Sequence, residues 1–250
     1  MQLLGSVVFT FLLLVLTPLW GVGMALCFFL PHRAHFAMAR AWARTLLWLL
    51  RILCRLDHVV IGAENLPAGA HVALWKHSSS WETIAQMVLL PPQVWVLKRE
   101  LMWVPLVGWG LALTRPIAID RSAGHAAVKH VLEQGKDRIA RGYWVSIFPE
   151  GTRMAPGTTR KYGVSGALLA RAAGCLIVPV AHNAGYFWPR RGLIKRPGTI
   201  QVVIGAPIDP KDSEPRAINE RVQQWVEGQI RALQNETQQE RPGAPTSDRP

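Results

Sequence analysis

The stretch HVALWKHSSSWETIAQMVLL, residues 71–90, places an apolar run, a polar loop and an amphipathic run in direct succession. The run His71–Trp75 is typical of a buried strand, and Trp81–Leu90 is typical of a helix that begins after the serines. A strand followed by a loop and a helix is the repeating unit of an α/β domain. The loop side chains are then expected at a strand end, where ligand sites gather in open α/β sheets.

Two residues of this loop, His77 and Glu82, have the chemistry of a general-base pair. An imidazole takes up a proton near neutral pH, and a carboxylate fixes its tautomer and stabilises the imidazolium. Five residues along a helix correspond to about 140° of rotation, so the two side chains would not share a helix face. They meet if His77 lies in the loop and Glu82 in the first helical turn, with Ser79 or Ser80 as N-cap. The alternative is a surface histidine near an unrelated glutamate, since acids favour helix starts.

The rest of the globular region repeats the same alternation and predicts an α/β fold with a mixed, mainly parallel sheet flanked by helices. The expected strands are His58–Ile61, His71–Trp75, Gln93–Leu97, Pro116–Ile119, Trp144–Phe148, Leu176–Ala181 and Thr199–Ile204. The expected helices are Trp81–Leu90, Ala123–Ala140, Gly163–Ala173 and Glu214–Leu233. We expect three parts: N-terminal membrane-associated helices at 1–56, the catalytic-type domain at 57–233, and a polar, disordered tail at 234–250.

Composition narrows the class of partner. The chain has 250 residues, half of them apolar, eleven tryptophans and a net charge of +12. That length suits one sizeable domain with appendages, and the charge indicates an anionic partner such as a membrane surface, an anionic substrate or nucleic acid. The three scattered cysteines have neither disulfide nor metal-ligand spacing, which favours a reducing compartment.

The segment from Leu3 to Leu30 carries no charged residue. It is long enough to span a bilayer with some tilt, and Pro18, Gly21 and Gly23 also permit a re-entrant hairpin. A cleaved signal peptide fits poorly because the segment lacks a basic start and a small-residue cleavage site. A buried core helix is the remaining alternative.

The following segment, His32–Leu56, is amphipathic and basic. Its arginines recur at helical intervals beside a broad apolar surface, and no acid occurs before Asp57. This is typical of an interfacial helix whose arginines reach anionic headgroups, and the positive-inside rule would put His32 onward in the cytoplasm. The alternative is an amphipathic helix docked on its own domain. Together the two segments predict a hydrophobic membrane-seating helix pair before the α/β domain.

Three more segments bear on chemistry, each at a strand or its end. Arg121 follows the strand Pro116–Ile119 and is placed to reach a cleft. The string Phe148-Pro149-Glu150-Gly151-Thr152-Arg153 runs from a strand into a turn, where a guanidinium fork suits phosphate oxygens. The buried run Leu176–Ala181 contains Pro179, which indicates a sheet edge or a special backbone position. Ordinary charged loops and core packing are the alternatives for all three.

Motifs of several other chemistries are missing from the sequence. It contains no GxSxG nucleophile elbow, no Walker A loop, no HExxH and no CxxC. A general base without a protein nucleophile indicates that a hydroxyl of the substrate itself attacks. A phosphate-bearing, membrane-resident alcohol fits this pattern, and backbone N–H groups near Ser78–Ser80 are the expected donors to the oxyanion.

Taken together, the motifs resemble those of the glycerolipid acyltransferase family, and most closely its bacterial 1-acyl-sn-glycerol-3-phosphate (lysophosphatidic acid) acyltransferases. The resemblance runs from about Asp57 to Ile208. Four motifs carry it, in this order: His77 followed five residues later by an acid, the block Lys98 to Arg121, the string Phe148–Arg153, and Ile177–Val180.

The resemblance implies roles for individual residues. His77 would deprotonate the glycerol hydroxyl that attacks an acyl thioester, and Glu82 would orient His77. The acceptor phosphate would be bound by Arg121, Glu150, Gly151, Thr152 and Arg153, and Pro179 would belong to the acyl-donor site. The implied substrates are lysophosphatidate or a related lysolipid, with acyl-CoA or acyl-carrier protein as donor and no cofactor or metal. The implied location is the cytoplasmic side of the bacterial inner membrane.

Two departures from the family pattern keep other functions open. The usual aspartate is Glu82 here, and the residue before the histidine, often asparagine, is Lys76, which would lower the histidine pKa or contact a phosphate. Both departures leave another lysophospholipid or a lyso-aminolipid as an alternative acceptor. A non-enzymatic, basic membrane- or nucleic-acid-binding protein is a second alternative, but no nucleic-acid-binding motif is present, so we expect no nucleic acid partner.

Overall fold

A seven-stranded sheet organises the protein, whose computed structural model describes residues 1–211 and 213–239. The strand order is β1-β7-β6-β2-β5-β3-β4. Only β6 and β7 pair antiparallel, and all other neighbours are parallel. The mixed, mainly parallel sheet predicted from the sequence is therefore confirmed. The strands are β1 (Leu56–Ile61), β2 (Val72–Trp75), β3 (Gln93–Lys98), β4 (Ile117–Ile119), β5 (Trp144–Ile147), β6 (Ile177–His182) and β7 (Gly198–Ile204).

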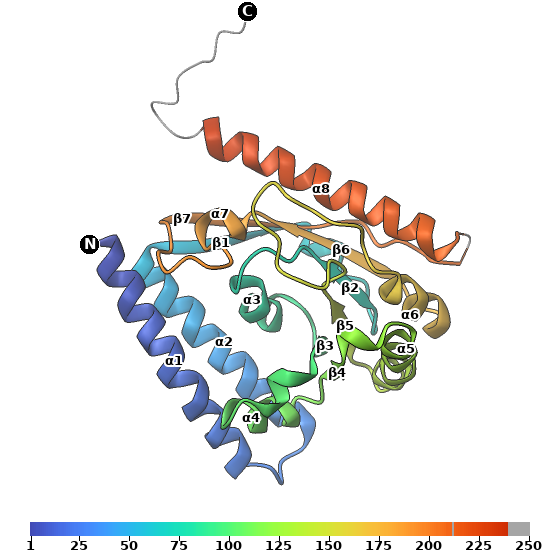
Figure 1. Ribbon diagram of the computed structural model, residues 1–250, viewed down its shortest axis with the longest axis horizontal. Coiled ribbons are helices and arrows are strands. Elements are labelled where there is room, and N and C mark those ends of the chain that lie inside the picture. Colours follow the sequence, from blue (N-terminus) through green and yellow to red (C-terminus); the bar gives the residue numbers. More distant parts are fainter. Residues whose placement is uncertain (212, 240–250) are drawn as a thin grey trace, which may run out of the picture.

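Helices cover both faces of the sheet (Figure 1). Strand β2 shows why: its side chains alternate, with Val72 and Leu74 in one core and Ala73 and Trp75 in the other. The first core is closed by α5, α6 and α8, and the second by α2, α3 and α7. The helices are α1 (Gln2–Leu26), α2 (His32–Cys54), α3 (Trp81–Leu89), α4 (Val107–Leu113), α5 (His125–Ala140), α6 (Ser165–Ala173), α7 (Ala184–Phe187) and α8 (Pro215–Gln239), with short 3-10 segments η1 (Ala63–Asn65), η2 (Arg99–Trp103) and η3 (Arg121–Ala123).

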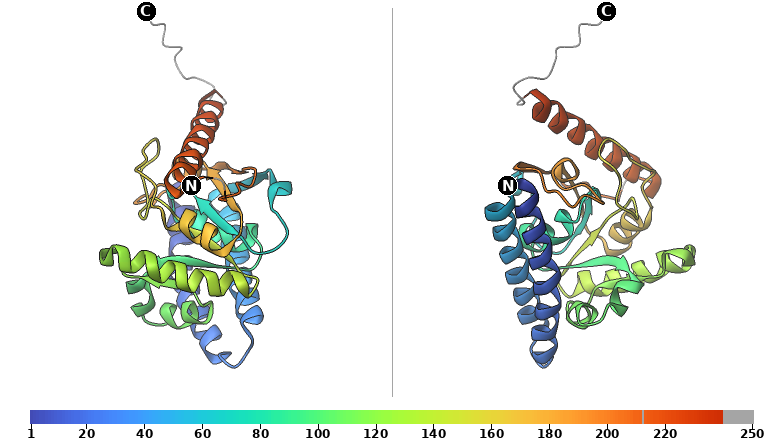
Figure 2. Two further views of the ribbon diagram at one scale, coloured as in Figure 1. Left: turned by 90° about the vertical axis from the view of Figure 1, so that its right-hand side faces the viewer. Right: turned by 60° about the vertical axis from the view of Figure 1, so that its left-hand side comes forward.

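Helices α1 and α2 form a hairpin on one side of the domain (Figure 2). Among the described residues, α1 is the one helix long and apolar enough to cross a membrane, by length and composition. Most of its large apolar side chains are exposed along one stripe, which includes Leu4, Phe11, Leu14 and Leu19. Helix α2 instead buries its apolar face, including Ala43, Leu46 and Leu50, against the domain.

The arginines of α2 therefore divide between two roles. Arg40 donates to the carbonyl oxygens of Met87 (3.0 Å) and Leu90 (2.9 Å) at the end of α3, and Arg51 pairs with Asp57. For Arg40 the prediction of headgroup contact is wrong, because docking of α2 on the domain provides its guanidinium with partners within the chain. For Arg51, which stays exposed, headgroup contact remains a prediction. Arg44 lies exposed and remains available to a membrane.

Two further expectations need correction, and a third point decides between two predicted alternatives. Helix α8 continues to Gln239, so the part of the predicted tail from Gln234 to Gln239 is helical, and residues 240–250 lie outside the described residues. Helix α4 and segment η2 fill an apolar stretch that the sequence left as a loop. For Pro179, the second predicted alternative, a special backbone position, is confirmed: β6 lies inside the sheet, and Pro179 occupies the position just before its ladder with β7 begins, where no N–H is needed.

Candidate active site

The loop between β2 and α3 brings His77 and Glu82 together. Nδ1 of His77 lies 2.8 Å from Oε1 of Glu82, whose side chain is fully buried at the start of α3. The histidine side chain remains one-tenth exposed. The predicted contact between loop histidine and first-turn glutamate is confirmed. Since Nδ1 faces a carboxylate it carries the proton, which leaves the lone pair of Nε2 free to accept one.

Glu82 also shapes the loop around it. Its Oε1 accepts hydrogen bonds from the backbone N–H groups of Ser78 (2.9 Å) and Ser79 (2.8 Å) as well as from His77. Burial opposes ionisation, but the hydrogen bonds from His77 and from these N–H groups favour the carboxylate, and the pKa of Glu82 is lowered. The N–H groups of Ser78 and Ser79 are thus engaged by Glu82, so the expectation that they stabilise the oxyanion is wrong for these two residues and stays a prediction for Ser80.

The sequence did not single out His182, at the end of β6, as part of this cluster. It is fully buried beside Trp75 and Trp81, and its Nε2 lies 3.8 Å from Oε2 of Glu82. Nε2 donates to the carbonyl oxygen of Lys76 (2.9 Å), while Nδ1 accepts from the N–H of Ala184 (3.3 Å). This pattern requires the neutral ring, and burial lowers the pKa of His182 in the same direction. Its position in a buried, apolar strand gave no sign of this role.

A cleft of about 350 Å³ lies next to His77. The ring of Phe148 lines this cleft and also stacks on the imidazole of His77, with ring centroids 4.1 Å apart. Arg121, at the end of β4, lines the same cleft, as the sequence predicted for a residue following a strand. Its backbone is positioned by Asp120, whose carboxylate accepts from the N–H of Ser122 and from Arg99.

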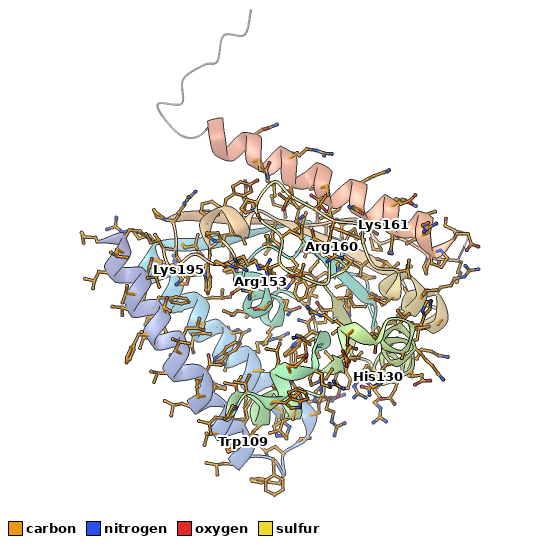
Figure 3. All side chains as sticks on the ribbon, in the orientation of Figure 1. Trp109, His130, Arg153, Arg160, Lys161 and Lys195 are labelled. Carbon is orange, nitrogen blue, oxygen red and sulfur yellow. The ribbon has the colours of Figure 1, made fainter. Side chains whose placement is uncertain are left out.

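Two cations in this cleft were missed by the sequence reasoning. Arg160 and Lys161 line it from the segment before α6, and Figure 3 shows both near α8. Arg121, Arg160 and Lys161 are all exposed, and none forms an ion pair within the described residues. Three cations around one cleft suit a doubly charged phosphate. The dipeptide stands in a polar, irregular stretch of sequence, where no periodicity marks it as part of a site.

The four expected phosphate-binding residues that follow Pro149 have different surroundings. Gly151 lines the cleft and has φ +67, which favours glycine. Glu150 is buried, with its two oxygens 2.8 Å from Nζ of Lys76 and 2.9 Å from the N–H of His77. Arg153 donates to Oγ of Ser80 (2.6 Å) in the loop between β2 and α3, residues 76–80, which we name the catalytic loop after its expected role. Thr152 is half-buried in the same turn.

Lys76 and Pro179 complete the predicted set. Lys76 is only 3% exposed and its ammonium donates to Glu150, Glu227 and the carbonyl oxygen of Thr158, so it has no donor left for a substrate phosphate. Pro179 lies buried in β6 opposite Leu74 of β2. In the described residues, no group of three His, Cys, Asp or Glu side chains is placed to hold a metal ion.

A histidine–carboxylate pair beside a cationic cleft, both at the carboxyl ends of parallel strands, is typical of a general-base enzyme of the α/β class that acts on an anionic substrate. Comparison with known proteins gives the family. The model of the Acyltransferase family matches residues 57–183, and the chain belongs to this family.

Individual relatives agree with this assignment. A 1-acyl-sn-glycerol-3-phosphate acyltransferase of Pseudomonas aeruginosa is 43% identical over 233 residues, which cover 90% of each chain. One from Cocos nucifera is 26% identical over 84% of this chain and 68% of its own length. The crystal structure of the 1-acyl-sn-glycerophosphate acyltransferase PlsC of Thermotoga maritima has the same fold, with a TM-score of 0.77, 22% identity and coverage of 93% of this chain and 96% of that one.

Proposed function

We propose that the protein transfers a fatty acyl group from an acyl thioester to the sn-2 hydroxyl of 1-acyl-sn-glycerol-3-phosphate and so forms phosphatidate. The proposal rests on one observation: the ring of Phe148 lines the cleft that holds Arg121, Arg160 and Lys161, and it also stacks on the imidazole of His77. A phosphate held by the cleft would bring a glycerol hydroxyl near Nε2 of His77. The name of the Pseudomonas relative, which covers nearly the whole chain, supports the same substrate.

The chemistry needs one base and no protein nucleophile. Nε2 of His77 takes the proton of the hydroxyl while its oxygen attacks the thioester carbonyl, and Glu82 stabilises the imidazolium. The tetrahedral intermediate then collapses, the carbon–sulfur bond breaks, and the leaving thiolate takes the proton from His77. Base catalysis contributes about 10²–10⁴-fold, and the remainder comes from holding two substrates in line.

A phosphomonoester acceptor is favoured over other lysolipids by the charge of the cleft. Arg121, Arg160 and Lys161 offer three positive charges, which match a group with about two negative charges better than a phosphodiester with one. Lys76, the departure that left other acceptors open, is buried and paired, so it gives no reason to expect a phosphate-free acceptor.

The acceptor is tested by an acylation panel on the full-length protein in vesicles. Lysophosphatidate, lysophosphatidylcholine and a phosphate-free lyso-aminolipid are each offered with acyl-CoA and, separately, with acyl-carrier protein. We expect lysophosphatidate to be acylated fastest with at least one donor. Faster acylation of the phosphate-free lipid with both donors would contradict the proposed acceptor.

We further propose that α1 lies along one leaflet instead of crossing the bilayer. Near its first turns, Ser6 accepts from the N–H of Lys195 (2.9 Å). Near its other end, a Cβ on Gly21 would lie 2.3 Å from the carbonyl oxygen of Leu106, so the backbones are in contact. Since α1 is about 37 Å long and held to the domain at both ends, a perpendicular crossing would carry the domain into the bilayer.

Side chains of the domain extend the apolar stripe of α1 at both ends. Trp103 (66% exposed) and Trp109 (56% exposed) lie beside its C-terminal half, and Leu193 and Ile194 lie beside its first turns. In Figure 3, the labels of Trp109 and Lys195 mark these two places. Tryptophan and basic residues are typical of a membrane–water interface.

An anionic membrane surface on the cytoplasmic side of the bacterial inner membrane is the partner we propose for this face. Arg33, Arg44 and Arg141 line a cleft beside α2 that suits anionic headgroups. Protease treatment of spheroplasts and of inverted inner-membrane vesicles tests the side. We expect cleavage of the domain only in inverted vesicles, and cleavage in intact spheroplasts would contradict the orientation.

A further inference from the structure

A buried cluster of charges lies directly beneath the catalytic loop and includes neither His77 nor Glu82. The ammonium of Lys76 lies 2.8 Å from Oε1 of Glu150, 2.7 Å from Oε1 of Glu227 and 2.9 Å from the carbonyl oxygen of Thr158. An ammonium has three protons, so all its donors are used. Tyr162 adds a hydroxyl that donates to Oε1 of Glu227 (3.3 Å), and burial raises the pKa of Tyr162, which keeps this proton in place.

The cluster reaches the base through the backbone. The second carboxylate oxygen of Glu150 accepts from the N–H of His77 at 2.9 Å. The carbonyl oxygen of His77 accepts from the N–H of Met154 (2.7 Å), and that of Lys76 accepts from His182 (2.9 Å). The peptide groups on both sides of the His77 side chain are therefore held by hydrogen bonds, and one of these bonds ends on Glu150, a member of the cluster.

Three distant segments meet in this cluster. Lys76 follows β2, Glu150 follows β5, and Glu227 stands on α8, which packs against α6 and β6. Helix α8 contributes no residue to the cationic cleft. The carboxylate of Glu227, on α8, nevertheless accepts from the ammonium of Lys76, the residue before His77. This one ammonium therefore connects the position of α8 with the position of His77.

We propose that Lys76 and Glu227 are positioning residues that fix His77 for proton transfer by tying the catalytic loop to α8. The proposal rests on the acyl transfer proposed above. It explains why a lysine precedes the histidine: a shorter, neutral side chain there would not join carboxylates from two other segments.

Removal of Lys76 and removal of the charge of Glu227 should affect the catalytic loop to different extents, because they leave different charges in the cluster. Removal of Lys76 would leave Glu150 and Glu227 buried together without their cation. Burial already raises the pKa of Glu150 against the opposing effect of Lys76, so one carboxyl group would take up a proton and the acceptor for the N–H of His77 would weaken. Removal of the charge of Glu227 would leave the Lys76–Glu150 pair neutral and intact, with a smaller effect on the loop.

The test uses full-length Lys76→Met, Glu227→Gln and the double variant, assayed for acylation of lysophosphatidate in vesicles. A displaced base lowers turnover by up to about 10²-fold. We expect kcat to fall about 10- to 100-fold in Lys76→Met and less than 10-fold in Glu227→Gln, with KM for lysophosphatidate changed less than about twofold. The double variant should be no slower than Lys76→Met, because the loss of Glu227 relieves the repulsion. Glu220→Gln, at an exposed position of α8, is the matched control and should equal the wild type.

Each outcome bears on the proposal. Unchanged kcat in both single variants, a rise in KM with constant kcat, or multiplicative losses in the double variant would overturn it. If Lys76→Met does not fold, the lower kcat of Glu227→Gln at unchanged KM carries the test alone, and its absence overturns the proposal. Failure of the wild type to acylate lysophosphatidate would instead contradict the proposed function.

Discussion

The catalytic loop and the cationic cleft lie side by side and are built in opposite ways. In the loop, His77, Ser78, Ser79 and Glu82 each form hydrogen bonds with one another or with buried neighbours. In the cleft, the exposed side chains of Arg121, Arg160 and Lys161 form no ion pair within the chain as described. The loop is thus organised before substrate arrives, whereas the cleft is completed by an anion. Changes in the loop should lower kcat, and changes in the cleft should raise KM.

The largest effect is expected from removal of the base. His77→Ala should lower kcat by about 10²–10⁴-fold, because no other group accepts the hydroxyl proton. Measurement of phosphatidate formation, with binding of the protein to vesicles as a check of folding, tests this. His130→Ala, on α5 and outside the cleft, is the control and should keep full activity. Comparable activity in both variants would remove His77 from the role of base.

The second-largest effect is expected from a change of Glu82, the partner of the base. Glu82→Gln keeps an oxygen for the N–H groups of Ser78 and Ser79 but loses the charge that stabilises the imidazolium. A hydrogen bond to a charged group contributes about 1.5–3 kcal/mol, so kcat should fall about 10- to 100-fold. Steady-state kinetics with lysophosphatidate should show little change in KM. An equal rise in KM would mean that the loop also contacts the acceptor.

A change in the cleft should affect binding instead. Arg121→Ala removes one charged contact to the phosphate, and KM for lysophosphatidate should rise about 10- to 100-fold with a nearly constant kcat. The matched control is Lys129→Ala, which removes an exposed cation of α5 paired with Glu133. If both variants raise KM equally, the general positive charge of the domain and not the cleft attracts the substrate.

The loop should also affect stability in acid. The pKa of Glu82 lies below its ordinary value near 4.5, so its contribution to stability is complete above about pH 4.5 and is lost as pH falls through the lowered value. Denaturant unfolding of the detergent-solubilised protein, compared with Glu82→Gln, isolates this contribution. The difference in unfolding free energy between the two proteins should shrink on acidification, and a constant difference would contradict an ionised Glu82.

The smallest effect is expected at the membrane surface. Arg44→Gln removes one cation from the cleft beside α2, and a basic residue near an anionic surface contributes about 1 kcal/mol. Binding to anionic vesicles in sedimentation should weaken about fivefold. Arg51→Gln, whose guanidinium is paired with Asp57, is the control. Equal weakening in both would indicate that the charge of α2 as a whole, and not this cleft, is recognised.

The features that were predicted correctly from the sequence are those that local residue patterns determine. The strand and most helix positions follow from apolar periodicity, and the contact of His77 with Glu82 follows from a loop that meets a helix start. The order of strands and the ion cluster of Lys76 with Glu227 depend on contacts between segments far apart in the chain, which periodicity does not encode. Helix α4 was missed because an apolar stretch with two glycines also suits a loop.

The tautomer of His77 is the most direct test, because the whole account depends on a protonated Nδ1 and a free Nε2. Nitrogen-15 NMR of the imidazole-labelled protein in detergent measures it, with the His77→Gln variant assigning the signals. We expect the neutral ring to carry its proton on Nδ1, where it exchanges slowly, and to leave Nε2 unprotonated, with this arrangement lost in Glu82→Gln. A proton on Nε2 of the neutral ring would contradict the account.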